Sequence, residues 1–422
     1  MSVGQKILIV EDDPIIADLY QRKFVAEHFT VELAGDGSTA MESLKSQRPD
    51  VVLLDLQLPQ VNGIEVLKFI RATPELRTLP VIVFTNAYLG NMVQSAWKAG
   101  ANKCLTKAIC TPRQVVDVVR LSLTEAGANP AAVPDVAAVP VTPPNLVPLV
   151  ENAPPLSAAE TERDTIFQSE VRRQFMQSSP QMLVDVRQRL QAVVKSEADA
   201  AYLRWLEERA QLLREMYRTL HSLTGKAGLA GFKQVAQLSS ALEAFLRELH
   251  EAPQNANSSS LRTFAHAMDF LARLMEFEGQ ADHDTSTIPL ALIVDDEVFS
   301  RRSIISGLEK AGIAYVSLDN PIEALEMLGR QKFDLVFLDI DMPEMDGFTL
   351  CQKLRQLPDY TRTPVVFVTG LNDFQMRARS SLAGGSDIIA KPFLPIELAV
   401  KSLTHMYKAR FLPLDKAASP PA

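Results

Sequence analysis

A repeated segment limits what this chain of 422 residues can fold into. Asp12 and Asp296 are 284 residues apart, and so are Lys107 and Lys391. The matching blocks are KILIVEDDPI (6–15) with LALIVDDEVF (290–299), VVLLDLQLPQVNG (51–63) with LVFLDIDMPEMDG (335–347), PVIVFTN (80–86) with PVVFVTG (364–370), and LTKA (105–108) with IAKP (389–392). Four blocks in a single register, with no net insertion, indicate two copies of one domain.

Short apolar runs alternate with helix-length segments in each copy. The runs are ILIV, VVLLD and VIVFT in the first copy, and ALIV, LVFLD and VVFVT in the second. Strands that are apolar on both faces are typical of a parallel sheet covered by helices. We therefore predict βαβ units wound into a parallel sheet, in which ligands bind beyond the carboxyl ends of the strands.

The residues between the copies fall into three stretches of different character. Residues 124–160 contain eight prolines and few charges, which predicts a semi-extended linker. Residues 161–277 predict an all-helical segment of four or five helices, with breaks near 178–180 and 252–260. The predicted order is an α/β domain (1–123), the linker (124–160), the helical segment (161–277), a polar hinge (278–288), a second α/β domain (289–410) and a tail (411–422).

Composition and charge exclude several classes of protein. The net charge of −8 gives no general attraction to nucleic acid, so we expect no direct nucleic-acid partner. Three cysteines are too few for a disulfide framework and favour a reduced compartment. The N-terminal residues hold no signal-peptide core, and no apolar run approaches the roughly 20 residues that span a bilayer. We expect a cytoplasmic protein with no membrane contact of its own.

Acidic residues stand at the expected strand ends of both copies. They are Glu11, Asp12 and Asp55 in the first copy, and Asp295, Asp296 and Asp339 in the second. Three carboxylates this close repel one another unless a cation joins them, and Mg²⁺ is the hard ion that prefers such oxygen ligands. A hydroxyl and an ammonium lie at the same ends: Thr85 and Lys107 in the first copy, Thr369 and Lys391 in the second. Such a set can clamp a phosphoryl group, and its chemistry is in-line attack by an aspartate to give an aspartyl phosphate.

With these motifs, each copy resembles a response-regulator receiver domain over about 120 residues. The resemblance implies a flavodoxin-like doubly wound fold and one Mg²⁺ per receiver. It makes Asp55 and Asp339 the phosphoacceptors, Thr85 and Thr369 the switch hydroxyls, and Lys107 and Lys391 the family's lysines. The metal ligands implied are Glu11, Asp12 and Asp55, and Asp295, Asp296 and Asp339.

The first copy departs from the family pattern more than the second. The family usually has a proline after the lysine, often with a cis peptide bond; Pro392 occupies this position in the second copy and Ala108 in the first. Asn86 follows Thr85, where a small residue such as Gly370 is common. We therefore expect slower access to Asp55 than to Asp339. Neither copy has the family's frequent aromatic residue three positions before the lysine, where Cys104 and Ile388 stand.

His221 opens a glycine-rich run, HSLTGKAGLAGF (221–232). Gly225 lies one helical turn after His221, on the same face, and Gly228 and Gly231 follow. Glycine in a helix costs about 1 kcal/mol relative to alanine, so three of them call for a reason. One reading is that the missing side chains let another protein surface approach a nucleophilic imidazole. The other is that the glycines serve as caps or packing sites at a helix end near Gly231.

This run is similar to the histidine-phosphotransfer motif, in which H-x-L-x-G-x-A precedes a further glycine. The resemblance covers roughly 161–277 and implies a helical-bundle histidine-phosphotransfer (HPt) domain with His221 as phosphoacceptor. Many members carry a lysine where this chain has Thr224, and Arg218 or Lys226 are candidates for that positive charge.

The predicted fold class is therefore α/β plus all-α, with two receivers flanking the HPt segment. The leading function is a phosphorelay protein, without an ATP-binding kinase domain, that exchanges phosphoryl groups among Asp55, His221 and Asp339. Its partners would be a sensor histidine kinase and/or other phosphorelay proteins. The alternative is a phosphorylation-controlled binding adaptor with a non-functional HPt domain.

Overall fold

The computed structural model describes residues 4–86, 90–108, 110–128, 158–195, 202–252, 255–280, 289–370, 379–380 and 382–411. No helix within these ranges is both long and apolar enough to cross a membrane.

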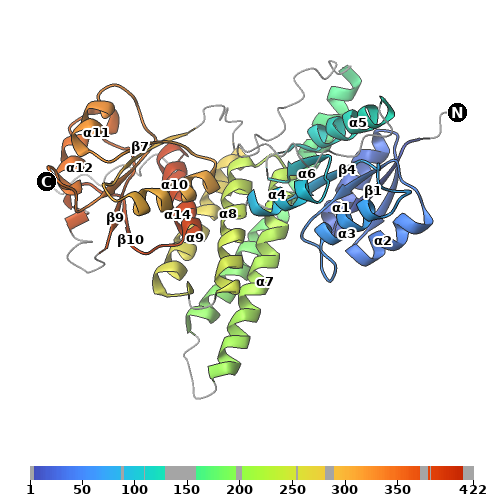
Figure 1. Cartoon of the computed structure of the whole chain (residues 1–422), viewed down its shortest axis with the longest axis horizontal. Helices are drawn as coiled ribbons and strands as arrows, with labels where there is room; N and C mark the ends of the chain where they lie inside the picture. Colours follow the sequence, from blue (N-terminus) through green and yellow to red (C-terminus); the bar gives the residue numbers. More distant parts are fainter. Residues whose placement is uncertain are drawn as a thin grey trace. The chain divides into compact units, whose positions relative to one another are not determined.

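The first sheet has five parallel strands in the order β2-β1-β3-β4-β5, of which β1 and β4 are labelled in Figure 1. Its strands are β1 (Lys6–Val10), β2 (Thr30–Ala34), β3 (Val51–Leu54), β4 (Val81–Thr85) and β5 (Lys103–Thr106). Every residue of β3 and β4 is buried, as expected for strands covered on both faces. Chain order reverses between β1 and β3, and ligands of doubly wound folds bind beside such a reversal.

Five helices accompany this sheet, and local signals set where they begin. They are α1 (Pro14–Ala26), α2 (Gly37–Ser46), α3 (Gly63–Ala72), α4 (Gly90–Lys98) and α5 (Pro112–Ala128). Asp13 caps α1 by accepting hydrogen bonds from the amides of Ile15 and Ile16, and Pro14 supplies the preset φ of a first helical residue. Asp36 and Asn62 cap α2 and α3 in the same way.

The second sheet repeats the first in the order β7-β6-β8-β9-β10. Its strands are β6 (Leu290–Val294), β7 (Ala314–Leu318), β8 (Leu335–Asp339), β9 (Val365–Thr369) and β10 (Asp387–Ala390). Its helices within the described ranges include α10 (Val298–Ala311), α11 (Pro321–Leu328), α12 (Gly347–Arg355) and α14 (Pro395–Phe411). The predicted α/β plus all-α class is confirmed.

The helical segment between the sheets in the chain contains α6 (Ala158–Lys195), α7 (Tyr202–Leu229), α8 (Lys233–Glu251) and α9 (Ser258–Gln280). The expected break near 178–180 is wrong, because α6 continues through Pro180. Phe175, Leu183 and Val186 are buried on both sides of this proline, so side-chain packing outweighs the roughly 3 kcal/mol that proline costs inside a helix. The break expected near 252–260 is present between Glu251 and Ser258.

Helices extend into the predicted linker and hinge. Helix α5 continues to Ala128, α6 begins at Ala158, and α9 continues to Gln280. Most of the linker, most of the hinge and the tail after Phe411 lie outside the described residues.

The chain divides into two compact units, and each unit combines one sheet with part of the helical segment. The first unit comprises Met1–Val186 with Glu215–Ser240, and the second comprises Arg187–Arg214 with Ala241–Ala422. In the second unit α9 packs along α14, where Thr263 Oγ1 donates to Glu397 at 2.8 Å and the rings of Phe277 and Phe411 are 5.5 Å apart.

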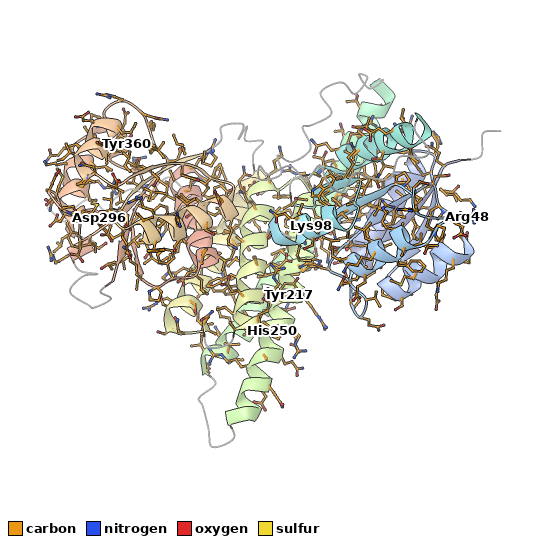
Figure 2. The ribbon with its side chains drawn as sticks, viewed as in Figure 1. Arg48, Lys98, Tyr217, His250, Asp296 and Tyr360 are labelled. Atoms are coloured by element: carbon orange, nitrogen blue, oxygen red, sulfur yellow. The ribbon has the colours of Figure 1, made fainter. Side chains whose placement is uncertain are left out.

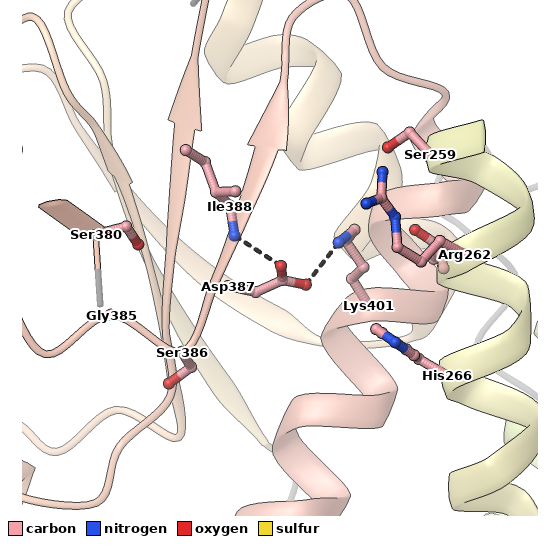
Figure 3. A pocket seen from close by; sticks show the side chains of 10 residues that line it. Ser259, Arg262, His266, Ser380, Gly385, Ser386, Asp387, Ile388 and Lys401 are labelled. Atoms are coloured by element: carbon pink, nitrogen blue, oxygen red, sulfur yellow. Dashed lines mark hydrogen bonds and ion pairs between the residues drawn. The ribbon is translucent and has the colours of Figure 1, made fainter. Parts of the chain in front are cut away.

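A pocket of about 230 Å³ lies between α9 and the second sheet (Figure 3). Arg262 and His266 of α9 face it, and across it Asp387 accepts a hydrogen bond from Lys401 Nζ at 2.6 Å. Its lining contains none of the acidic residues that the sequence singled out.

Gly63 and Gly347 occupy equivalent positions, just after the loops that follow the two phosphoacceptor candidates. A Cβ atom on either glycine would lie 2.1 Å from a backbone carbonyl oxygen, that of Asp55 or of Asp339. Real Cβ atoms do not come so close, so these positions require glycine in both copies.

We predict that Gly63→Ala and Gly347→Ala each lower the free energy of unfolding by about 1–3 kcal/mol or more, because the added methyl group displaces the loop. Urea-induced unfolding of the full chain measures this loss. Gly35→Ala is the matched control, since a Cβ there meets nothing within 4 Å. Equal stability of all three variants would contradict this packing.

Candidate functional site

The side chains singled out in the first copy lie together at the carboxyl ends of the strands. Glu11 and Asp12 follow β1, Asp55 follows β3, Thr85 ends β4, and Lys107 follows β5. The backbone holds this edge in register, because Lys107 N donates to Thr85 O at 3.1 Å and Asp55 N donates to Val10 O at 3.0 Å.

Lys107 is a buried ammonium group that joins two of the carboxylates. Its Nζ lies 2.5 Å from Asp55 Oδ2 and 2.6 Å from Glu11 Oε2. Burial by itself would raise the pKa of Asp55, but the charge of Lys107 and the neighbouring His221 hold that pKa well below its usual range. Burial raises the pKa of Glu11 to about 7, although Lys107 opposes this shift. Asp55 is therefore the carboxylate that stays ionised and can act as a nucleophile.

Asp12, Asp55 and His221 each offer a ligand atom, and these atoms lie within 4.8 Å of one another. Glu11 is paired with Lys107 instead. The oxygen donors of Asp12 and Asp55 have the chemistry that suits a hard cation such as Mg²⁺, which usually takes water or phosphate oxygens as its remaining ligands.

The second copy assembles an equivalent, all-carboxylate cluster. Asp295, Asp296 and Asp339 offer oxygens that lie within 4.8 Å of one another, and Asp296 is labelled in Figure 2. Lys391 Nζ lies 2.8 Å from Asp339 Oδ1 and 3.1 Å from Asp295 Oδ2, and Lys391 N donates to the carbonyl of Thr369 at 2.7 Å. Burial raises the pKa of Asp339, whereas the pKa of Asp55 is lowered, and His221 is among the causes of the difference.

Helix α7 places His221 directly over the first of these sites. His221 Nε2 lies 3.7 Å from Asp55 Oδ2, too close for another atom to lie between them unless it is bonded to one of them. The ring stacks on Tyr217, one turn earlier on α7 (Figure 2), with centroids 6.1 Å apart and planes 19° apart. Gln57, two residues after Asp55, donates from Nε2 to Tyr217 Oη at 2.6 Å.

Two of the three glycines after His221 allow this approach. A Cβ on Gly225 would lie 2.4 Å from Ile16 Cδ1, and a Cβ on Gly228 would lie 1.9 Å from the carbonyl oxygen of Lys107. Gly231 has a different role, because its φ of +78° ends α7 in a left-handed turn. Gly225 and Gly228 thus serve as packing sites and Gly231 as the helix end, and the approach of another protein surface to His221 stays a prediction.

Polar contacts surround the glycine face, and the sequence did not reveal them. Ser222 Oγ donates to Asp13, whose Oδ2 also lies 3.6 Å from Lys226 Nζ. Asn86 Nδ2 donates to the carbonyl of His221 at 2.8 Å, and Ser240 Oγ donates to the carbonyl of Asn86 at 3.1 Å. Only the sequence position of Asn86, next to Thr85, marked it as unusual.

Thr224, which stands where related domains often have lysine, is an interior hydroxyl. It is fully buried and donates to Leu220 O at 2.8 Å within α7. Lys226, a candidate for the missing positive charge, pairs with Asp13.

Comparison with known proteins identifies the domains. The response regulator receiver domain family matches residues 7–120 and 291–402, which is more than half of the chain. The chain belongs to this family. The Hpt domain family matches residues 170–276, so the order is receiver, Hpt, receiver, the domain set of phosphorelay signal-transduction proteins.

Curated relatives share one receiver with this chain. The probable transcriptional regulator ycf27 of Guillardia theta is 35% identical over 120 residues, which cover 28% of this chain and 46% of that protein. The DNA-binding response regulator MtrA of Mycolicibacterium smegmatis is 34% identical over 130 residues, which cover 31% of this chain and 55% of that protein. The chain thus spans about half the length of these relatives.

Solved receivers are similar in the same way. The chemotaxis response regulator CheY4 of Vibrio cholerae has 28% identity and a TM-score of 0.27, and the match covers 28% of this chain and 99% of that one. A two-component response regulator from Clostridium difficile has 30% identity and a TM-score of 0.27, and the match covers 28% of this chain and 97% of that one.

The receiver pair differs at the residue after the lysine. Lys391–Pro392 is the one cis peptide bond within the described ranges, so the bond from Lys107 to Ala108 is trans. Ala108 is buried, and the close approach of Gly228 is to Lys107 and Ala108.

We predict that Asp339 accepts phosphoryl from acetyl phosphate faster than Asp55 does in the full chain. The Asp55 side chain has an exposed fraction of 0% beneath His221, whereas that of Asp339 is 8%. Labelling rates of the Asp55→Asn and Asp339→Asn variants, each of which leaves one acceptor aspartate, measure the difference.

Gly228→Ala in the Asp339→Asn background separates access from intrinsic reactivity. Its new Cβ would displace α7 from the first receiver, so labelling of Asp55 should speed up. Equal rates at the two aspartates, unaffected by Gly228→Ala, would show that α7 does not restrict Asp55.

Proposed function

We propose that this protein is a phosphorelay component in which a phosphoryl group passes between Asp55 and His221 of the same chain. The observation that carries the proposal is the 3.7 Å separation of His221 Nε2 and Asp55 Oδ2. A phosphoryl group bonded to either atom would lie against the other, which is the proximity that phosphoryl transfer requires. Asp339 is a second acceptor that exchanges phosphoryl with donors of its own.

Transfer from His221 to Asp55 needs no further reactant. A carboxylate oxygen of Asp55 attacks the phosphorus, its P–O bond forms as the P–N bond breaks, and the ring leaves as neutral imidazole with its proton on Nδ1. In the reverse direction neutral His221, with its proton on Nδ1, attacks the aspartyl phosphate through the Nε2 lone pair, and the carboxylate leaves with the electron pair of the broken P–O bond. Lys107 balances the negative charge of Asp55 and of the phosphoryl oxygens in both directions.

A magnesium ion at each receiver is part of the proposal. Asp12 and Asp55 would hold it in the first receiver, with Glu11 nearby, and Asp295, Asp296 and Asp339 would hold it in the second. When bound, the ion neutralises phosphoryl oxygens during transfer. Thr85 and Thr369, buried at the ends of β4 and β9, are the proposed switch hydroxyls that donate to a phosphoryl oxygen.

The receivers are proposed to catalyse their own phosphorylation from a phosphohistidine, and their own dephosphorylation. The upstream donor is proposed to be a sensor histidine kinase or another phosphorelay protein. A cytoplasmic location fits these partners, and Cys104, Cys110 and Cys351 are all free thiols.

The alternative, an adaptor with an inactive HPt domain, gives no reason for two of the observations. An inactive histidine would have no need of a glycine face that brings it against a phosphoacceptor candidate, nor of a tyrosine stacked on its ring. The relay reading explains both.

We expect label on Asp55 to move to His221 in the full-length Asp339→Asn variant. Brief exposure to acetyl [³²P]phosphate labels Asp55, and after removal of the donor, alkali-stable phosphohistidine should appear as alkali-labile aspartyl phosphate declines. His221→Gln should show no alkali-stable label. His266→Gln is the matched control, because this exposed histidine of α9 lies outside the proposed site.

The adaptor reading replaces the relay if no phosphohistidine forms with either receiver as donor. Label on His221 that comes from Asp339 alone would instead reject the assignment of Asp55 as its partner.

A further inference from the structure

The two receivers share their reactive residues but differ at five other positions where the first receiver contacts α7 or α8. Asp55, Thr85 and Lys107 have identical counterparts in Asp339, Thr369 and Lys391. The contact positions and their counterparts are Asp13 and Glu297, Ile16 and Ser300, Gln57 and Asp341, Asn86 and Gly370, and Ala108 and Pro392. The reactive residues are therefore the same in both receivers, whereas the residues of the first receiver around the contact with His221 are different in the second.

Asn86 makes the contacts nearest to the histidine. Its Nδ2 donates to the His221 carbonyl at 2.8 Å and lies 3.4 Å from His221 Nδ1. Its own carbonyl accepts from Ser240 Oγ of α8 at 3.1 Å, so one residue joins the strand end to both helices. Asn86 is 1% exposed, and a hydrogen bond made at such burial is costly to lose.

The asparagine follows directly after Thr85, the last residue of β4. Its position relative to Asp55 is therefore fixed by the sheet, and its amide fixes the backbone of His221. The sheet and Asn86 together therefore connect Asp55 to His221 and set the distance between the two reacting atoms. Contacts at the edge of the receiver surface act on this distance less directly.

We infer that Asn86 is the specificity-determining residue that positions His221 for exchange with Asp55 in preference to Asp339. The inference rests on the proposed function and adds the basis of its selectivity. Gly370 has no side chain with which to make this bond, and Asp341 would place a carboxylate where Gln57 donates to Tyr217. Ser300 would place a polar group where Ile16 faces Gly225.

The experiment uses the full chain in the Asp339→Asn background and measures two rates for each variant. One is the labelling of Asp55 by acetyl phosphate, and the other is the transfer of label from Asp55 to His221. Asn86→Gly, which installs the residue of the second receiver, should lower the rate of transfer relative to the rate of labelling about tenfold, the effect of one lost buried hydrogen bond. Asn62→Gly is the matched control, because Asn62 only caps α3 at the surface and glycine is tolerated at such caps.

Asn86→Asp provides a second variant of nearly the same size. A carboxylate cannot donate to the His221 carbonyl, so this variant should also lose transfer relative to labelling. In both variants, hydrogen exchange at residues 217–228 should become faster, which a change in the chemistry of Asp55 alone would not cause.

Transfer at the rate of the parent chain in both Asn86 variants would overturn the inference. So would a fall in transfer and labelling by the same factor, since Asn86 would then act on Asp55 itself. If the Asp339→Asn parent chain never moves label from Asp55 to His221, the proposed function fails instead, and the two failures are distinguishable.

Discussion

The close approach of α7 to the carboxyl edge of the first sheet is the contact on which the proposed function depends. It exists because Gly225 and Gly228 carry no side chain where Ile16 and the Lys107 carbonyl come near. One methyl group at Gly228 would meet backbone that the sheet holds in place, and backbone cannot move aside as the end of a side chain can. Two glycines that would weaken an isolated helix thus allow the imidazole of His221 to lie against the buried carboxylate of Asp55.

The same reactive residues stand in two different surroundings. In the first receiver Lys107 is buried and pairs with both Asp55 and Glu11, and the neighbouring His221 lowers the pKa of Asp55 further. In the second receiver Lys391 is partly exposed and contacts Asp339, Asp295 and Glu297. The same fold therefore contains one aspartate, Asp55, that lies against a histidine and another, Asp339, that is more exposed to solvent.

Most of the reactive set could be predicted from the sequence because the sheet dictates it. Parallel strands bring residues that follow β1, β3 and β5 to one edge, so Asp12, Asp55 and Lys107 had to meet once the strands were recognised. The pairing of Glu11 with Lys107 rather than with Asp12 depends on side-chain direction, which strand order does not determine. The helix through Pro180 was missed because the buried stripe on either side of it comes from tertiary packing.

The contacts between the first receiver and α7 were beyond sequence reasoning for a similar reason. Asn86, Gln57 and Tyr217 are ordinary polar residues, and their partners are more than 130 residues away in the chain. Only the glycine run indicated that a protein surface approaches His221, and its pattern did not predict which surface that is. The repeat itself showed that Asn86 and Gln57 differ from their counterparts Gly370 and Asp341, but the two copies also differ at many positions that make no such contact.

The most direct test of the central claim, that Asp55 and His221 meet within one chain, is the concentration dependence of transfer between them. Two groups held in one chain react at a rate set by their fixed effective concentration, whereas groups on separate chains depend on encounter. The first-order rate constant for movement of label from Asp55 to His221, measured over about a hundredfold dilution of the Asp339→Asn chain, should stay constant. A rate constant that falls in proportion to protein concentration would contradict the account, because the histidine would then be serving another molecule.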